Sequence, residues 1–325
     1  MFLRKAYNMQ TRQFFVSAAR QRLRARFPVG LHVLAGLAAL AAGPTVLASS
    51  AHAVSIPTTG LTFWVDASDP LGNGSTPVPG ALSTWVNKAP TAQQDGLAAV
   101  VQASPTNQPT LTTAATGLNG LPVVRFDGVN DFMQNPFTTA LGQATEIFMV
   151  WKADSIGGNA SIAFDGFSPA GRQTMAYENQ GGVNMIDMGA GTPAGANSGI
   201  ASSFSTAIYT TAIYNGNGSL WIDGAPQTFT NPYVGTNPLD GVTLGGRYDT
   251  YPGGGSGDRF SLDGYIAEML VYNSPLDTTD RNAVESYLDN KWFVVSTPEP
   301  ASAVLASIGI VGLALLGWRR LRTDA

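Results

Sequence analysis

The stretch that most constrains this chain is residues 260–292, which predicts one strand, one tight turn and one amphipathic helix. Apolar side chains fill both alternating faces of residues 265–272, and one charged residue, Glu268, interrupts them. A strand that is apolar on both faces is typical of one buried between two layers. Regular alternation predicts one face with Tyr265, Ala267, Met269 and Val271, and another with Ile266, Glu268, Leu270 and Tyr272.

A helix is predicted directly after this strand. Ser274-Pro275 ends the strand, because proline has no backbone N–H to give to the ladder. Asp277 is placed to cap the helix N-terminus, and Asp280 adds negative charge to its first turn. The apolar stripe of the predicted helix consists of Val284, Tyr287, Leu288 and Trp292.

Charge and composition exclude several functions for the central segment. Residues 54–297 hold eight Lys and Arg against twenty Asp and Glu, a formal charge of −12 that disfavours binding to nucleic acid. The chain has no cysteine, and its two histidines, His32 and His52, lie in the N-terminal segment. Disulfides, thiol catalysis, Ser-His-Asp chemistry and most transition-metal sites are therefore excluded from the central segment.

Residues 1–53 have the anatomy of a secretory signal peptide. Seven basic residues precede an apolar run over residues 29–42, and Ala51 and Ala53 flank His52 in a small-x-small cleavage site. We expect signal peptidase to cut there. The alternative is that the apolar run is retained as a membrane anchor.

The tail, residues 297–325, predicts a transmembrane helix. An uncharged run over residues 301–318 is about 27 Å long as a helix, enough to cross a hydrocarbon core. The basic end, residues 319–322, is expected to stay cytoplasmic, which leaves the preceding domain outside.

With its Pro298-Glu299-Pro300 triplet before the helix and its basic end, the tail resembles the PEP-CTERM sorting signal. This resemblance implies that an exosortase recognises and cuts the tail during export. It also implies delivery to the cell surface or extracellular polysaccharide matrix, with membrane contact only through the tail helix before processing.

Between these ends, residues 54–296 predict one all-β domain, because short apolar strands alternate with turns rich in glycine, asparagine, proline and aspartate. The predicted strands are residues 60–66, 81–87, 123–126, 132–133, 146–152, 206–214, 219–222 and 242–246. Asn215-Gly216-Asn217-Gly218 predicts a hairpin turn, and residues 88–120 predict a long variable loop.

Four blocks of this segment resemble, in order, the bacterial LamG-like form of the laminin-G, concanavalin A-like jelly roll. They are RFDGVNDFM (125–133), AIYNGNGSLWIDGAPQ (212–227), VTLGGRY (242–248) and LDGYIAEMLVYNSPLDTTDRNAVESYL (262–288). The resemblance covers roughly residues 60–293, with poor matches over 88–120 and 153–205. It implies an antiparallel β-sandwich with one short C-terminal helix. Family members bind carbohydrates or proteins, and some relatives are glycosidases.

Two loops are candidate binding sites. Arg247, Tyr248, Asp249 and Tyr251 combine planar aromatic rings with hydrogen-bonding groups and suit contact with a sugar face. The alternative is an ordinary glycine-rich surface loop. In the second loop, Asp127, Asn130 and Asp131 offer the oxygen ligands that calcium takes, or else they only shape turns.

The sequence shows no paired-carboxylate motif of a glycosidase. Asp263 and Glu268 are the nearest candidates, and their odd separation predicts that they point to opposite faces. Glu268 is expected to pair with Arg247 or Arg259. We therefore expect a non-catalytic binding module for an extracellular polysaccharide or a surface protein. The alternatives are a structural matrix protein without a specific ligand and, third, a glycosidase.

Overall fold

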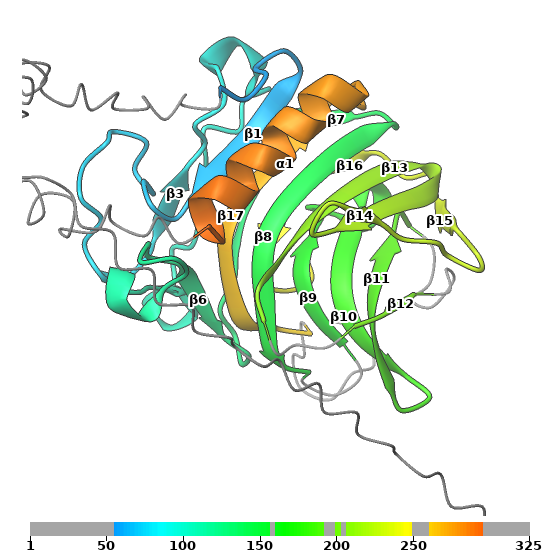
Figure 1. The fold of residues 1–325 in the computed structure, drawn as a ribbon. Coiled ribbons are helices and arrows are strands. Elements are labelled where there is room, and N and C mark those ends of the chain that lie inside the picture. The colour runs from blue at the N-terminus through cyan, green and yellow to red at the C-terminus, as the bar shows by residue number, and fades with distance from the viewer. Residues whose placement is uncertain (1–54, 157–159, 192–198, 203–205, 249–259, 295–325) are drawn as a thin grey trace, which may run out of the picture. The chain divides into compact units, whose positions relative to one another are not determined.

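Two antiparallel β-sheets and one helix make up the part of the chain that the computed structural model describes, which is residues 55–156, 160–191, 199–202, 206–248 and 260–294 (Figure 1). The predicted signal peptide (1–53) and the PEP-CTERM tail (297–325) lie outside these ranges. Within them, no helix combines the length and the apolar character that crossing a membrane requires.

The first sheet, called sheet A, has the strand order β14-β13-β8-β17-β6-β5-β2, with β1 also paired to β17 and β15 to β13. Its strands are β1 (Leu61–Asp66), β2 (Gly80–Ala81), β5 (Thr110–Leu111), β6 (Val124–Asp127), β8 (Thr145–Ser155), β13 (Ile208–Ile222), β14 (Ala225–Pro226), β15 (Tyr233–Gly235) and β17 (Asp263–Tyr272). β17, the last of the described strands in sequence, is therefore central in the sheet.

The second sheet, called sheet B, has the order β12-β11-β10-β9-β16-β7-β4-β3. Its strands are β3 (Thr84–Val86), β4 (Ala99–Val101), β7 (Met133–Leu141), β9 (Ala160–Asp165), β10 (Thr174–Gln180), β11 (Val183–Gly189), β12 (Ile200–Ala201) and β16 (Leu239–Leu244). Short 3₁₀ helices are η1 (Thr91–Gln93), η2 (Pro105–Asn107), η3 (Ala114–Thr116) and η4 (Pro169–Gly171). This arrangement confirms the predicted all-β sandwich with one C-terminal helix.

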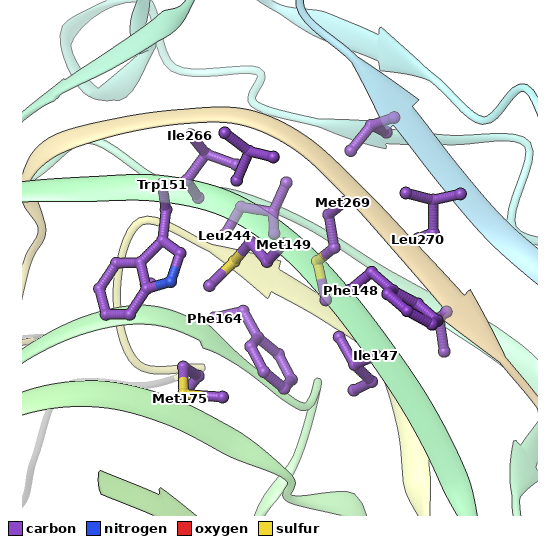
Figure 2. Packing of buried hydrophobic residues seen from close by; sticks show 14 of the residues in the cluster. Ile147, Phe148, Met149, Trp151, Phe164, Met175, Leu244, Ile266, Met269 and Leu270 are labelled. Carbon is purple, nitrogen blue, oxygen red and sulfur yellow. The ribbon is translucent and has the colours of Figure 1, made fainter. Parts of the chain in front are cut away.

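The core lies between the two sheets, as Figure 2 shows. Met149 and Trp151 of β8 and Met269 of β17 come from sheet A, and Phe164 of β9 and Met175 of β10 come from sheet B. All five side chains are almost completely buried. Burial of large apolar side chains on this scale is the main favourable contribution to folding.

The predicted face assignment of β17 is wrong beyond its middle. Its register with β8 shifts between Ile266 and Glu268, so Ala267 is an extra, bulged residue. A bulge of one residue reverses which later side chains face each layer. Tyr265 therefore shares the outer face of sheet A with Glu268, while Ile266 and Met269 share the inner face.

The helix α1 (Thr278–Trp292) lies along the outer face of sheet A (Figure 1). The side chain of Asp277 accepts a hydrogen bond from the backbone N–H of Asp280 at 2.9 Å, which confirms the predicted cap. Val284, Leu288 and Trp292 are fully buried, as the predicted stripe requires. The helix is thus packed by one apolar face rather than attached at its end.

Glu268, which was expected from the sequence to pair with Arg247 or Arg259 (the latter lies outside the described residues), is held beneath this helix by other side chains. Its fully buried carboxylate accepts hydrogen bonds from Trp64 Nε1 at 2.7 Å, Tyr287 Oη at 2.8 Å, Lys291 Nζ at 2.8 Å and Trp292 Nε1 at 2.6 Å. The bulge places Glu268 on the same outer face as Tyr265, which is the face that α1 covers. Burial raises the pKa of Glu268, and the Lys291 ammonium acts in the opposite direction.

Two predicted connections also differ. Residues 88–120 contain β4, β5 and three 3₁₀ helices rather than one long loop. The sequence Asn215-Gly216-Asn217-Gly218 lies inside the continuous strand β13, where the register with β15 shifts between Gly216 and Asn217. The extra residue at this shift is Val234 of β15, so the glycine-containing sequence continues the strand instead of turning. The turn itself falls at Asp223-Gly224, whose φ angles of 49° and 73° suit a tight hairpin.

Replacing Trp292 by alanine should lower the free energy of unfolding by about 3–5 kcal/mol, because a buried ring is lost and Glu268 loses a donor. Asp277→Ala removes only a cap and should cost about 1 kcal/mol. Urea unfolding of both variants measures the difference. Equally mild effects would mean that α1 contributes little to the core.

Candidate functional site

The outer face of sheet B, on the opposite layer from α1, carries a set of hydrogen-bonding side chains. Directly paired residues of an antiparallel sheet point to the same side. Thr243 of β16 is paired both with Gln134 of β7 and with Asp165 of β9, so these three form a row. Phe164 and Leu244, the neighbours of Asp165 and Thr243, face the core. The row therefore faces away from the core.

Asp165 is a buried carboxylate of this face that is held by several hydrogen bonds. It is fully buried and accepts hydrogen bonds from Arg172 Nε at 3.1 and 3.2 Å and from the backbone N–H of Gly166 at 2.9 Å. The backbone N–H of Tyr248 also bonds to it. Burial raises the pKa of Asp165 to about 7 against the opposing effect of Arg172.

Glu178 and Asp187 form an acid pair on the adjacent hairpin. Asp187 of β11 lies opposite Ala176 of β10, so Glu178, two residues further along β10, is its diagonal neighbour on the same face. Burial and the nearby Asp187 carboxylate raise the pKa of Glu178 to about 7. Two carboxyl groups this close do not both ionise readily, so at neutral pH the pair holds a shared proton for part of the time.

Gln134 adds an unused acceptor to the row. Its Oε1 atom is buried and has no hydrogen-bond partner in the part of the chain that the structure describes. The neighbouring Thr243 donates its hydroxyl to the carbonyl oxygen of Gly166 at 2.9 Å. A buried acceptor without a partner is costly, and such groups gather at sites that bind ligands or water.

The predicted sugar-contact loop begins at this face. The Arg247 guanidinium lies 5.4 Å from the centre of the Tyr248 ring, and the Tyr248 backbone is bonded to Asp165. Because Asp165 also bonds to Arg172, two of the four predicted residues, Arg247 and Tyr248, are placed beside Arg172. Asp249 and Tyr251 lie outside the described residues.

The predicted calcium loop uses its carboxylates to hold a turn. Asp127 Oδ1 accepts from the backbone N–H groups of Val129 at 2.8 Å, Asn130 at 3.2 Å and Asp131 at 3.4 Å. Asp131 Oδ2 accepts from the N–H of Asp127 at 3.0 Å. Burial raises the pKa of Asp131 to about 6, with a contribution from Asp127. These bonds support the turn-shaping alternative. No cluster of three or more acidic or histidine residues suited to a metal occurs among the described residues.

The expectation that Asp263 and Glu268 face opposite ways is also wrong. Asp263 pairs with Arg125 on the outer face of sheet A, and the bulge at Ala267 places Glu268 on that same face. The two carboxylates are still about 16 Å apart along the strand, far beyond the spacing of a glycosidase pair.

Sequence reasoning missed Asp165, Arg172, Glu178 and Asp187, all in a stretch that matches the resembled family poorly. One local signal was present. Gly181-Gly182 separates two alternating runs, and both glycines have positive φ angles, 61° and 87°. A two-glycine turn between such runs predicts a hairpin and thus the diagonal approach of Glu178 to Asp187.

The acid pair should make folding stability depend on pH. Glu178 has a raised pKa when folded, so the folded protein binds more protons than the unfolded chain between about pH 4.5 and 7. The contribution of Glu178 to the free energy of unfolding is fully present below pH 4.5 and is lost as the pH rises through 7. When the pH rises from 5 to 8, the free energy of unfolding of Glu178→Gln should therefore fall less than that of the wild type. The difference should be on the order of 1–2 kcal/mol, allowing for solvent screening.

Urea unfolding at the two pH values tests this expectation. Asp154→Asn, an exposed change on sheet A, is the matched control and should keep the wild-type pH dependence. An unchanged pH dependence in Glu178→Gln would contradict the shared-proton pair.

Comparisons with known proteins find only distant likeness. No protein-family model matches the sequence, and no curated protein matches it. A sialidase from Trypanosoma rangeli in complex with sialic acid has a TM-score of 0.47 and 15% identity over 75% of this chain and 35% of that one. This chain thus spans about a third of the sialidase's length.

Two further solved structures are similar over part of this chain. The SAP-like pentraxin of Limulus polyphemus has a TM-score of 0.34 and 12% identity, covering 49% of this chain and 78% of that one. The ligand-binding domain of botulinum neurotoxin serotype D, in complex with N-acetylneuraminic acid, has a TM-score of 0.39 and 11% identity, covering 70% and 50%.

Proposed function

We propose that this protein is a non-catalytic carbohydrate-binding module and that the outer face of sheet B is its binding surface. The observation that carries the proposal is the convergence of Gln134, Asp165, Arg172, Glu178 and Asp187 on that one face. The sequence resemblance to LamG-like jelly rolls, whose members include carbohydrate binders, supports the same function.

The chemistry of these groups suits sugar hydroxyls. A sugar hydroxyl both donates and accepts hydrogen bonds, so a binding surface needs both kinds of partner. Arg172 supplies donors, and the buried Gln134 oxygen supplies an acceptor. The pKa of Glu178, raised to about 7, lets this carboxyl group accept or donate near neutral pH, while the fully buried Asp165 holds Arg172 in place. Charge-assisted hydrogen bonds of this type are the stronger ones.

Tyr248 adds a planar apolar surface to the polar groups. It is half-buried, and its backbone is fixed to Asp165 on the same face. Binding sites for small polar ligands combine apolar or aromatic surface with a few placed polar groups. A sugar presents an apolar ring face and a polar rim, so this combination supports glycan rather than a purely ionic ligand.

The proposed place of action is the cell surface or extracellular matrix, after cleavage near Ala53 and processing at the tail. The support is sequence alone: the signal anatomy of residues 1–53 and the triplet, apolar run and basic end of residues 297–325. Signal peptidase and exosortase are the partners that this route requires. Many copies on a polymer would give useful retention even where one site binds weakly.

A glycan array, run with and without calcium, tests the binding function. Wild-type protein should bind a defined set of glycans, and Arg172→Ala and Tyr248→Ala should each reduce binding at least about tenfold through a lost charge-assisted bond or ring contact. Asp154→Asn, on the other sheet, is the control and should bind like the wild type. Absence of binding in a folded wild-type protein would overturn the proposal and leave the structural matrix protein as the alternative.

The acid pair favours one second function, glycoside hydrolysis. Glycosidases use one protonated and one ionised carboxyl group, and Glu178 with Asp187 has that electrostatic character. The hydrogen-bond contact between these two groups is closer than the ~5 Å of a retaining pair, so hydrolysis requires them to separate around a bound sugar. Release of reducing sugar from the glycans that bind on the array would measure it. If the protein is an enzyme, Asp187→Asn should lower the rate by about a hundredfold or more while the protein stays folded. Binding without release of sugar would exclude this function.

A further inference from the structure

The central strand of sheet A is also the last strand in the part of the chain that the structure describes. β17 pairs with β8 over the whole span from Asp263 to Tyr272, with β6 at one end and with β1 at the other. Without β17, the described strands of sheet A separate into three groups: β8 with β13, β14 and β15; β6 with β5 and β2; and β1 alone. None of the pairings within these groups replaces the missing ones.

The strand that β17 covers is poorly suited to exposure. β8 is apolar on both faces, and its seven residues from Thr145 to Trp151 are all buried. Until β17 is added, this strand keeps one unpaired edge of N–H and C=O groups. Long, flat, apolar edges of this kind pair readily with other chains.

Two buried carboxylates are satisfied by the segment after residue 262. Glu146 of β8 is fully buried, and it accepts from Arg281 Nε at 2.5 Å and from the backbone N–H of Leu276 at 2.6 Å. Glu268 lies on β17 itself, and three of its four donors come from α1. A carboxylate buried without its partners is strongly unfavourable, so the strand cannot dock stably without the helix.

The same segment ties down the beginning of the domain. Trp64 of β1 donates to Glu268 across 204 residues of sequence, and Lys291 of α1 lies 2.8 Å from Asp66 of β1. The first strand and the last helix are thus joined at one carboxylate of β17.

We propose that β17 and α1, residues 263–292, act as a single closing segment, and that the domain stays open until this segment has been made and docks as a unit. The upstream residues supply most strands of both sheets, yet they cannot complete sheet A or pair Glu146. Docking is all-or-none, because half-docked arrangements leave either Glu146 or Glu268 buried without partners. This inference does not depend on the proposed ligand or on the outer face of sheet B.

Thiol labelling of ribosome-bound chains tests the proposal directly, because the natural chain contains no cysteine. Val150→Cys places one thiol in β8 opposite Glu268, and Val242→Cys places one in β16 of sheet B; both positions are fully buried. Each chain is stalled on the ribosome behind a flexible linker. In one sample the residues up to 262 have emerged, and in the other the residues up to 294 have emerged.

Both thiols should react rapidly when the chain has emerged only to residue 262. Both should become protected, by about a hundredfold or more, once residue 294 has emerged. Protection of either thiol at residue 262 would overturn the proposal. The released full-length chains must protect both thiols, and if Val150→Cys perturbs folding, Val242→Cys alone still decides the outcome.

A second arm tests whether Glu268 holds the segment closed in the full-length protein. Glu268→Gln should increase native-state labelling of Val150→Cys by at least about tenfold, because an amide cannot accept at both positions from all four donors. Asp277→Asn, which keeps a capping side chain at the start of α1, is the matched control and should leave labelling unchanged. Equal labelling in the two variants would show that Glu268 does not hold the closing segment.

Discussion

One buried carboxylate determines how the outer layer of this protein is built. Glu268 has no solvent contact, and its charge is tolerated because four side chains donate to it. A buried carboxylate with this many donors costs far less than an unpaired one, but each donor must be placed correctly. The requirement fixes α1 against sheet A and fixes β1 beside β17. Packing alone would hold these elements together without specifying their register so closely.

The carboxylates of sheet B are in a different state. Glu268 is surrounded by donors, whereas Glu178 faces a second acid, Asp187, and its pKa rises to about 7. Asp165 is intermediate, with Arg172 and two backbone N–H groups as partners and a pKa also raised to about 7. Groups whose protonation is balanced near neutral pH are suited to exchange hydrogen-bonding roles with a ligand. The two layers therefore hold the same side-chain type in different electrostatic surroundings.

Local patterns predicted the fold and the last helix well, because each signal lies within a few residues. Asp277 caps α1, and Val284, Leu288 and Trp292 form its buried stripe, as their spacing indicates. The bulge at Ala267 could not be predicted, since it depends on pairing with β8 more than a hundred residues upstream. That one residue places Glu268 on the face of Tyr265 instead of the face of Ile266. Arg172 and Asp165 are brought together by a connection whose Ser168-Pro169 signal indicates a turn but not which side chains meet across it, so this part of the candidate site was missed.

The position of α1 has a consequence for how the domain would be presented when it is attached at its C-terminal side. The described chain ends at Val294, just after α1, where Asn119 Nδ2 donates to the carbonyl oxygens of Lys291 and Val294 at 2.9 Å. The C-terminal end of the described chain is therefore held by hydrogen bonds on the sheet A side of the sandwich. The outer face of sheet B lies on the other layer, directed away from that point. A domain tethered through its tail would hold this face towards its surroundings, and its own thickness would act as a spacer between the tether and anything that the face contacts.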